Sequence, residues 1–336
     1  MFSKKFKINS LIGQGSFSSV YSGVDVETSV PVAIKVFQKN LKVYFNIESE
    51  ILAKVSGKKG FPEIIWRGES NELFYIVMTL LGPSLRSRLQ TEGNHKLNIF
   101  KAGIKILDAL KRLHKENYIH RDLKLENIVQ GLNNPKDFYL IDFGLGKKYY
   151  DKRTHYHIPM KTDFKFKGNL IFCSNNVLSG IESSRRDDLV SLSLILLYVY
   201  KGTIPWIYHA TSIEAMIGFR SSTSLIDITI NAPHELSEFY KYTLSLGFYQ
   251  EPDYKYIKKL LTAQKIKKIK LRKSEINLKQ GKTKRKNKLT LIKSKSKIEE
   301  IKEFDTECPT VVAELPEFSK DLIQKVNVLR RIKISN

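Results

Sequence analysis

The sequence predicts an α+β protein in which a β-rich N-terminal lobe precedes a larger, mainly helical lobe. Residues 6–37 alternate between apolar and polar positions as strands do, and a glycine-rich turn interrupts them. Later segments repeat their apolar residues at helical spacing instead. The 336 residues are 42% hydrophobic, which is enough to bury a sizeable core and excludes a wholly disordered chain.

The N-terminal lobe is expected to contain four strands and one helix. The strands are expected at Lys7–Ile12, Ser19–Val24, Val32–Val36 and Leu73–Met78. The helix is expected over residues 42–55, where Ile47, Ile51 and Val55 share one face.

The C-terminal lobe is expected to begin after a connector at residues 79–83, where Gly82-Pro83 ends the strand pattern. Its helices are expected over residues 97–116, 188–200 and 235–247. The cleft between two such lobes is the expected ligand site.

Cysteine content and hydropathy favour a reducing, intracellular compartment, the cytoplasm, the nucleus or both. Cys173 and Cys308 are the only cysteines, so a disulfide scaffold is excluded. The first residues carry no long apolar stretch, and no signal peptide is expected. The longest apolar run, Leu189–Tyr200, has 12 residues where a membrane span needs about 20, so no span is expected.

The net charge of +23 is concentrated in one segment. Residues 255–297 contain 18 Lys and Arg against the single acid Glu275. A solvated basic tail explains this simply, and Lys282–Lys288 also fits a nuclear-import signal or a site for another anionic partner. Specific nucleic-acid recognition is disfavoured because Tyr256 is the only aromatic residue there to stack on bases.

A glycine-rich loop joins the first two predicted strands, with the sequence Gly13-Gln14-Gly15-Ser16-Phe17-Ser18-Ser19-Val20. Glycines let a backbone approach phosphate closely. A dinucleotide-binding fold would continue into a helix, whereas a strand follows here, which argues against that fold. Taken alone, the loop also fits an ordinary hairpin turn.

Lys35 ends a hydrophobic strand, and Glu48 follows 13 residues later in the predicted helix. A buried pair of these two would direct the ammonium group at ATP phosphates. Glu50 is the competing acid. The two glutamates differ by about 200° around a helix of 3.6 residues per turn, so only one can face Lys35.

The strongest motif is His120-Arg121-Asp122-Leu123-Lys124-Leu125-Glu126-Asn127. Asp122 can accept the proton of a substrate hydroxyl, Lys124 can neutralise a transferred phosphate, and Asn127 can hold a metal. Asp142-Phe143-Gly144 follows another short strand, and Asp142 supplies a second metal ligand. Mg²⁺ prefers hard oxygen ligands, which Asn127 and Asp142 provide. The glycine loop, the Lys35–Glu48 pair, the motif at 120–127 and the motif at 142–144, in this order, together indicate phosphoryl transfer from ATP.

On these motifs the chain resembles the eukaryotic protein kinase superfamily and, within it, the casein kinase 1 family, over roughly residues 6–262. Further matches to that family lie at Ile47-Glu48-Ser49, Leu80–Leu85, Lys147–Tyr149, Arg153–Pro159, Ser174-Asn175-Asn176 and Ser184–Leu189. The first of these favours Glu48 over Glu50 as the partner of Lys35.

The resemblance implies the bilobal protein-kinase fold. The N-lobe would span residues 6–78, the hinge 79–83 and the C-lobe 84–262, with a basic, flexible segment at 263–297 and a C-terminal segment of unknown role at 298–336. ATP would bind under the glycine loop, residues 12–20. The other residues of its pocket would be Ala33, Lys35, Met78 (the gatekeeper), Leu80, Leu81 and Ile141. Mg²⁺ would be held by Asn127 and Asp142, and Asp188 would hold the backbone of the catalytic loop.

The sequence departs from the family pattern at four places. Ser18 replaces the third loop glycine, which stiffens the loop without abolishing nucleotide binding, and Leu125-Glu126 replaces Pro-Asp, which is a mild change. Asn169 stands for a threonine that contacts the catalytic Asp and Lys, and it could replace that threonine imperfectly; losing one such bond costs about 1–3 kcal/mol. Ile171 replaces an arginine that binds a phosphorylated residue upstream of the target.

Recognition of protein substrates would therefore depend less on their prior phosphorylation. Arg121 and Lys147 are expected to keep a second anion site, with Lys161, Lys165 and Lys167 nearby in the sequence. Residues 1–254 carry a net charge of +8, which suits acidic protein substrates.

The sequence thus predicts a monomeric Ser/Thr protein kinase of casein kinase 1 type. Asp122 would be the base, Lys35 and Lys124 would carry phosphate charge, and Glu48 would position Lys35. One rival is a kinase-like scaffold with little activity, favoured by Asn169 and Ile171. The other is a nucleic-acid-associated protein that binds through residues 255–297.

Overall fold

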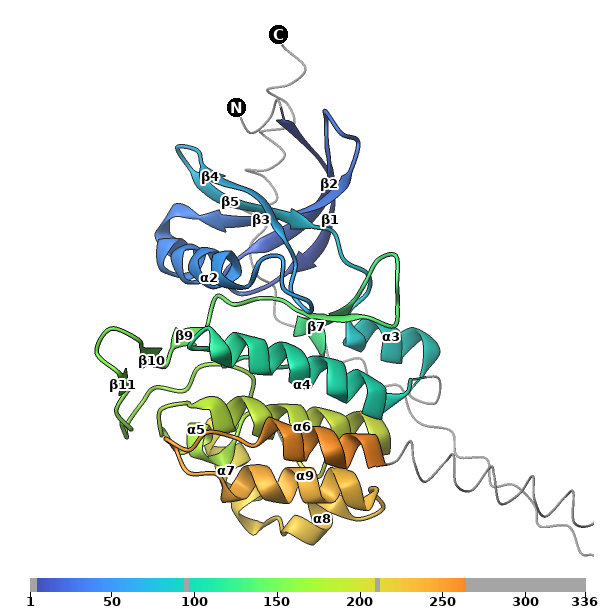
Figure 1. The fold of residues 1–336 in the computed structure, drawn as a ribbon, viewed down its shortest axis with the longest axis vertical. Helices are drawn as coiled ribbons and strands as arrows, with labels where there is room; N and C mark the ends of the chain where they lie inside the picture. The colour runs from blue at the N-terminus through green and yellow to red at the C-terminus, as the bar shows by residue number, and fades with distance from the viewer. Residues whose placement is uncertain (1–4, 94–96, 209–211, 264–336) are drawn as a thin grey trace, which may run out of the picture. The chain divides into compact units, whose positions relative to one another are not determined.

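The computed structural model describes residues 5–93, 97–208 and 212–263 (Figure 1). The predicted basic segment 263–297, except its first residue, and the predicted C-terminal segment 298–336 lie outside the described residues.

The N-terminal part is a five-stranded antiparallel sheet with the order β1-β2-β3-β5-β4. Its strands are β1 (Phe6–Gln14), β2 (Ser19–Asp25), β3 (Pro31–Gln38), β4 (Ile64–Glu69) and β5 (Leu73–Thr79). The four predicted strands are confirmed, and β4 is an addition. It is an edge strand whose inward positions are only half-buried, and its apolar residues Ile64, Ile65 and Trp66 are consecutive, so its sequence lacks the apolar–polar alternation that would reveal it.

Helix α2 (Lys42–Val55), preceded by the short helix η1 (Lys39–Leu41), lies against this sheet (Figure 1). It has the bounds that the sequence predicts. The ring of Phe45 stacks on Phe74 of β5 at 4.6 Å between centroids and meets Phe37 of β3 edge-on at 5.8 Å. These contacts and the buried Ile51, Leu52 and Val55 hold the helix to the sheet.

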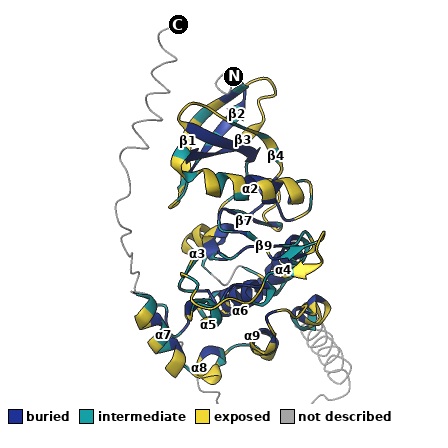
Figure 2. Ribbon diagram, turned by 90° about the vertical axis from the view of Figure 1, so that its left-hand side faces the viewer, coloured by how far each residue is buried: buried dark blue, intermediate teal, exposed yellow. Residues whose placement is uncertain are grey.

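The C-terminal part is helical. Its labelled helices are α3 (Leu85–Glu92), α4 (Ile99–Lys115), α5 (Asn175–Leu178), α6 (Arg185–Lys201), α7 (Ile213–Ser222), α8 (Leu225–Thr229) and α9 (His234–Ser245), and residues 254–263 are helical as well. Helix α6 is buried along most of its length, as the dark ribbon in Figure 2 shows. No helix among these described residues is long and apolar enough to cross a membrane.

The predicted helices are confirmed with shifted ends. Helix α6 begins three residues before the predicted 188, because the Asp187 carboxylate accepts the Ser184 N–H at 2.8 Å and caps the first turn. Helix α9 ends at Ser245, two residues before the predicted end, where Leu246 takes an extended conformation.

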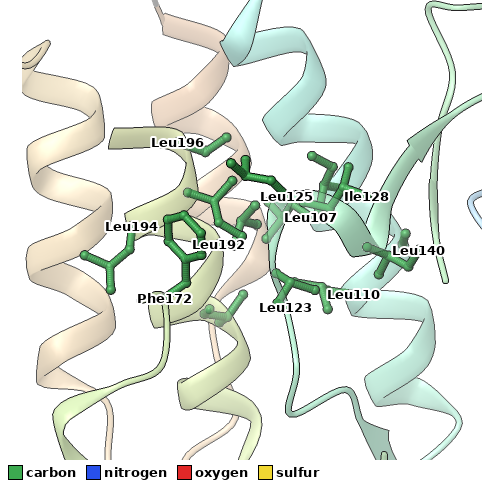
Figure 3. Close-up of a cluster of buried hydrophobic side chains, with 14 of the residues drawn as sticks. Leu107, Leu110, Leu123, Leu125, Ile128, Leu140, Phe172, Leu192, Leu194 and Leu196 are labelled. Carbon is green, nitrogen blue, oxygen red and sulfur yellow. The ribbon is translucent and has the colours of Figure 1, made fainter. Parts of the chain in front are cut away.

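Three two-stranded ladders position the loops between the lobes. They pair β6 (Tyr118–Ile119) with β9 (Lys147–Lys148), β7 (Ile128–Gln130) with β8 (Phe138–Leu140), and β10 (Tyr150–Asp151) with β11 (Tyr156–His157). The segment between β6 and β7 contains the short helix η2 (Leu125–Asn127). Figure 3 shows Leu123 and Leu125 of this segment in a cluster with Leu107 of α4 and Leu192 of α6. Burial of the two leucines anchors the polar residues between and beside them.

Candidate active site

Lys35 of β3 lies between two carboxylates. Its Nζ atom is 2.7 Å and 2.6 Å from the two oxygens of Glu48 and 2.8 Å from Oδ1 of Asp142. Burial alone would lower the pKa of Lys35, but the charges of Asp142 and Glu48 outweigh it and raise that pKa above its ordinary value. Lys35 is therefore a fixed cation.

Glu48 and Glu50 face different parts of the molecule, as the helical spacing predicts. Glu48 is buried against Lys35, which confirms the predicted pair. Glu50 accepts a hydrogen bond from the Tyr118 hydroxyl instead. Burial raises the pKa of Glu48 to about 7, with the Lys35 ammonium opposing the rise and the Asp142 carboxylate adding to it.

Asp142 follows β8 in a left-handed backbone conformation, with φ at 66°. This conformation is uncommon for a residue other than glycine and is kept where the surrounding structure demands it. Burial favours the neutral carboxyl, but Lys35 outweighs that effect and holds the pKa of Asp142 below its ordinary value. The carboxylate is ionised near neutral pH and remains 38% exposed in its side chain.

Asp122 is the centre of the segment between β6 and β7. Its Oδ2 accepts from Lys124 Nζ at 2.8 Å and from Asn127 Nδ2 at 3.1 Å, and its backbone oxygen accepts from the same amide at 2.8 Å. Burial raises the pKa of Asp122 while Lys124 opposes that rise. The sequence motif is thus assembled as a compact group of a base, a cation and an amide.

Asp188, at the start of α6, holds the backbone of this segment. Its carboxylate accepts from the N–H of His120 at 2.8 Å and of Arg121 at 2.9 Å. Its third partner is His114 Nε2 at 2.9 Å, while His114 Nδ1 contacts the Tyr254 hydroxyl at 2.6 Å. The anchoring expected of Asp188 is confirmed. Arg121, like Asp142, has a positive φ of 69°, which these bonds stabilise.

The glycine loop is a tight hairpin between β1 and β2. The Gly15 N–H donates to the Ser18 oxygen at 2.9 Å, and Gly13 pairs with Val20. Ile12, Gln14 and Ser16 are exposed, whereas Ser19 is buried. The Phe17 ring stacks on Tyr44 of α2 with centroids 3.8 Å apart.

The remaining predicted pocket residues come from both lobes. Ala33 pairs with Met78 between β3 and β5, so the two lie side by side in the sheet. Leu80 and Leu81 follow β5 and are partly buried. Ile141 follows β8. Its N–H donates to the backbone oxygen of Asn127 at 3.1 Å, and its own backbone oxygen lies 3.1 Å from His120 Nε2. The described residues thus place Ala33 and Met78 in the same sheet as Lys35 and tie Ile141 to the segment that contains Asp122.

Mg²⁺ fits the pair Asn127 and Asp142. The Asn127 amide nitrogen is used twice on Asp122, which leaves its oxygen for a cation. Asp142 presents a partly exposed carboxylate, and the residue before it, Ile141, is bonded to the Asn127 backbone at 3.1 Å. An amide and a carboxylate are hard donors, and Mg²⁺ commonly binds through such a small set together with phosphate oxygens and water.

Arg121 and Lys147 lie together, but an internal acid already engages one of them. Both cations lie over the Phe164 ring, at 5.4 Å and 5.2 Å from its centroid. Lys147 Nζ also pairs with the buried Glu182 at 2.6 Å. Glu182 is not predictable from the sequence, because nothing in its local sequence indicates an ion pair across 35 residues.

Asn169 uses its side-chain oxygen within its own loop. That oxygen accepts the N–H groups of Ile171 and Phe172, each at 2.9 Å, and so is not directed at Asp122 or Lys124. The expectation that it would replace a threonine is not met by this oxygen. Ile171 packs against the apolar core, and the Trp206 indole donates to its backbone oxygen at 2.8 Å.

A search against protein families matches residues 6–280 to the family described as the protein kinase domain. The match covers well over half of the 336 residues and includes every residue assigned above to the candidate site.

Proposed function

The chain belongs to the protein kinase family, and from this premise we propose that it is a Ser/Thr protein kinase of casein kinase 1 type. Membership supports ATP-dependent phosphotransfer to protein substrates. The finer assignment rests on Lys124, two residues after Asp122 and 2.8 Å from it, and on the local matches to the casein kinase 1 family.

The observation that carries the proposal is the grouping of five polar side chains at one place between the lobes. They are Lys35, Asp122, Lys124, Asn127 and Asp142, from segments far apart in the chain. Phosphoryl transfer depends mainly on positioning and charge neutralisation, and these residues supply both.

Each side chain has a distinct task in the proposed reaction. Asp122 accepts the proton of the substrate hydroxyl, and its raised pKa suits a base that must take up a proton. Lys124 and Lys35 neutralise phosphate charge, with Lys35 held by Glu48. Asn127 and Asp142 would hold Mg²⁺, which supplies further charge neutralisation when bound.

The proposed substrates are acidic proteins with little need for prior phosphorylation. Ile171 puts an apolar, core-packed side chain where the resembling family has an arginine, and Lys147 is paired with Glu182. Both features reduce the positive charge available to a phosphorylated residue of the substrate. Strong selection for phosphoserine three residues upstream of the target in a peptide library would contradict this specificity.

The test of the main proposal is transfer of labelled phosphate from ATP to casein in the presence of Mg²⁺. An Asp142→Asn variant is the matched control, since it removes one charge at nearly constant volume. We expect clear incorporation by the parent on serine and threonine and at least a 100-fold decrease in the variant, because it loses a metal ligand.

A scaffold with little transferase activity is the second candidate. It is favoured by Asn169, whose oxygen serves its own loop rather than Asp122 or Lys124. Incorporation by the parent no higher than by Asp142→Asn would favour the scaffold.

A further inference from the structure

A second hydrogen-bonded pair joins α2 to the C-terminal lobe beside the candidate site. The hydroxyl of Tyr118 donates to Oε1 of Glu50 across 68 residues of sequence. The Tyr118 residue is only 4% exposed, whereas Glu50 is exposed on its helix. Neither residue belongs to the ATP, metal or proton-transfer groups described above.

Tyr118 occupies a central place in the site's framework. It lies in β6, directly before the His120-Arg121-Asp122 segment, and pairs with Lys148 of β9. Strand β9 follows Asp142-Phe143-Gly144 by only two residues. A bond to Tyr118 is therefore a bond to the framework that carries both Asp122 and Asp142.

Glu50 lies two residues after Glu48 on the same helix, a rise of about 3 Å along its axis. The two acids point in different directions, Glu48 to Lys35 in the N-terminal sheet and Glu50 to Tyr118 in the C-terminal lobe. Because a helix is stiff over one turn, fixing Glu50 also fixes the position of Glu48 relative to Asp142.

The contacts that lie beyond the C-terminal end of α2 do not supply the same restraint. Lys58 pairs with Glu116 at 2.7 Å, and Arg112 Nη1 donates to the Lys59 oxygen at 3.2 Å. Both anchor the chain after α2 has ended at Val55. Phe45 and the buried Ile51 hold α2 to the sheet, and the Phe143 backbone bonds to Glu48 itself. The Glu50–Tyr118 bond adds a tie from the helix to β6 that does not depend on Glu48 remaining in place.

We propose that Tyr118 and Glu50 are positioning residues whose hydrogen bond holds α2 where Glu48 engages Lys35 beside Asp142. The role in catalysis rests on the proposed phosphotransfer function, but the restraint on α2 does not. Without the bond, conformations in which Glu48 has left Lys35 gain population, and activity falls in proportion to the competent fraction.

The test compares variants that remove or keep the bond. Tyr118→Phe deletes only the donor hydroxyl, Glu50→Ala deletes the acceptor, and Glu50→Gln keeps an acceptor oxygen. Tyr242→Phe is the matched control, because it likewise removes one hydrogen-bonded tyrosine hydroxyl. That hydroxyl accepts the Asp253 N–H at 2.7 Å and lies in the C-terminal lobe, away from α2. The first readout is amide hydrogen exchange of residues 42–55, and the second is kcat and KM for ATP.

We expect faster exchange in α2 for Tyr118→Phe and Glu50→Ala, and exchange close to the parent for Glu50→Gln and Tyr242→Phe. We expect kcat/KM to fall about 10- to 150-fold in the first two, in line with the loss of one hydrogen bond to a charged group. The double variant Tyr118→Phe/Glu50→Ala should be no worse than either single variant, because both remove the same bond.

Unchanged exchange in α2 overturns the proposal, whatever the activity. Faster exchange with kcat/KM within about twofold of the parent keeps the restraint but overturns its catalytic role. If the parent itself transfers no phosphate while exchange in α2 responds as expected, the proposed function fails and the restraint stands.

Discussion

The Nζ atom of Lys35 lies 2.8 Å from Oδ1 of Asp142, although 107 residues separate the two in the chain. The same ammonium holds both oxygens of Glu48, so one cation compensates two buried or partly buried carboxylates. This arrangement makes the stability of the site and its proposed chemistry depend on the same side chain.

Replacing Lys35 with methionine, alone and together with Glu48→Gln, should separate the role of Lys35 in stability from its role in phosphotransfer. Lys35→Met leaves Glu48 buried without its cation, and we expect the free energy of unfolding to decrease by about 3–5 kcal/mol. The double variant Lys35→Met/Glu48→Gln should recover part of that loss, because it no longer buries an ionisable acid. Phosphotransfer should stay at least about 100-fold below the parent in both. Denaturant unfolding and the casein assay measure the two effects, and recovery of activity in the double variant would contradict the assignment of Lys35.

Glu48 should give the activity an acid limb. Its pKa of about 7 exceeds the ordinary value of 4.5, so the carboxyl takes up a proton as the pH falls through 7 and its charge on Lys35 is lost. If the ionised form is required, kcat/KM should rise about tenfold between roughly pH 6 and pH 8.

Glu48→Gln is the control for this limb. Its kcat/KM should be low throughout and vary much less over the same pH range, because the side chain can no longer ionise. An acid limb that is unchanged in Glu48→Gln would assign it to another group, such as Asp122, whose pKa burial also raises.

Gly168 should not tolerate a side chain. Its φ is +118°, and a Cβ built there would lie 2.5 Å from the backbone oxygen of Arg121, which is itself held in a left-handed conformation. We expect Gly168→Ala to lower the free energy of unfolding by about 2–4 kcal/mol and to reduce activity at least tenfold by moving the neighbouring Asp122.

Gly202→Ala is the matched control for that clash. Gly202 also has a positive φ, +79°, but a Cβ at this position would have no described atom within 4 Å beyond its own chain neighbours. It should therefore show only the conformational cost of about 1 kcal/mol, with normal kcat. Equal effects of the two substitutions on kcat would show that the contact with Arg121 has no role in the site.

The sequence predicts the parts of this molecule that depend on local pattern. Helix α2 and strands β1 to β3 follow from periodicity alone. Helical spacing shows that only one of Glu48 and Glu50 can face Lys35, and the resemblance to the casein kinase 1 family is what favours Glu48. Strand β4 is missed because it lies at the sheet edge, where its inward positions are only half-buried and its consecutive Ile64, Ile65 and Trp66 give no apolar–polar alternation.

Contacts that form only through tertiary packing cannot be predicted from local sequence patterns. Lys147 meets Glu182, and Glu50 meets Tyr118, only after segments distant in sequence have packed together. The two hydrogen bonds to the Asn169 oxygen are local, yet the residue type allowed several other geometries, so the sequence could not choose among them.

Asn169→Thr should raise activity. The preceding residue, Gly168, lies next to Asp122, since a Cβ built there would be 3.9 Å from Asp122 Oδ1, so a threonine hydroxyl at 169 starts close to the proposed base. The hydroxyl can donate as well as accept, whereas the Asn169 oxygen now serves Ile171 and Phe172. One new hydrogen bond to Asp122 or Lys124 should increase kcat about fivefold or more.

Asn169→Ala distinguishes this gain from a simple loosening of the loop. It removes the acceptor of two N–H groups without adding a hydroxyl, so we expect about 1–2 kcal/mol lower stability and no increase in kcat. Steady-state kinetics with casein and ATP, together with thermal unfolding of both variants, provide the measurement. A gain in kcat shared by Asn169→Ala would mean that release of the loop, and not a bond to the base, limits the parent, and the proposed effect of the threonine hydroxyl would be wrong.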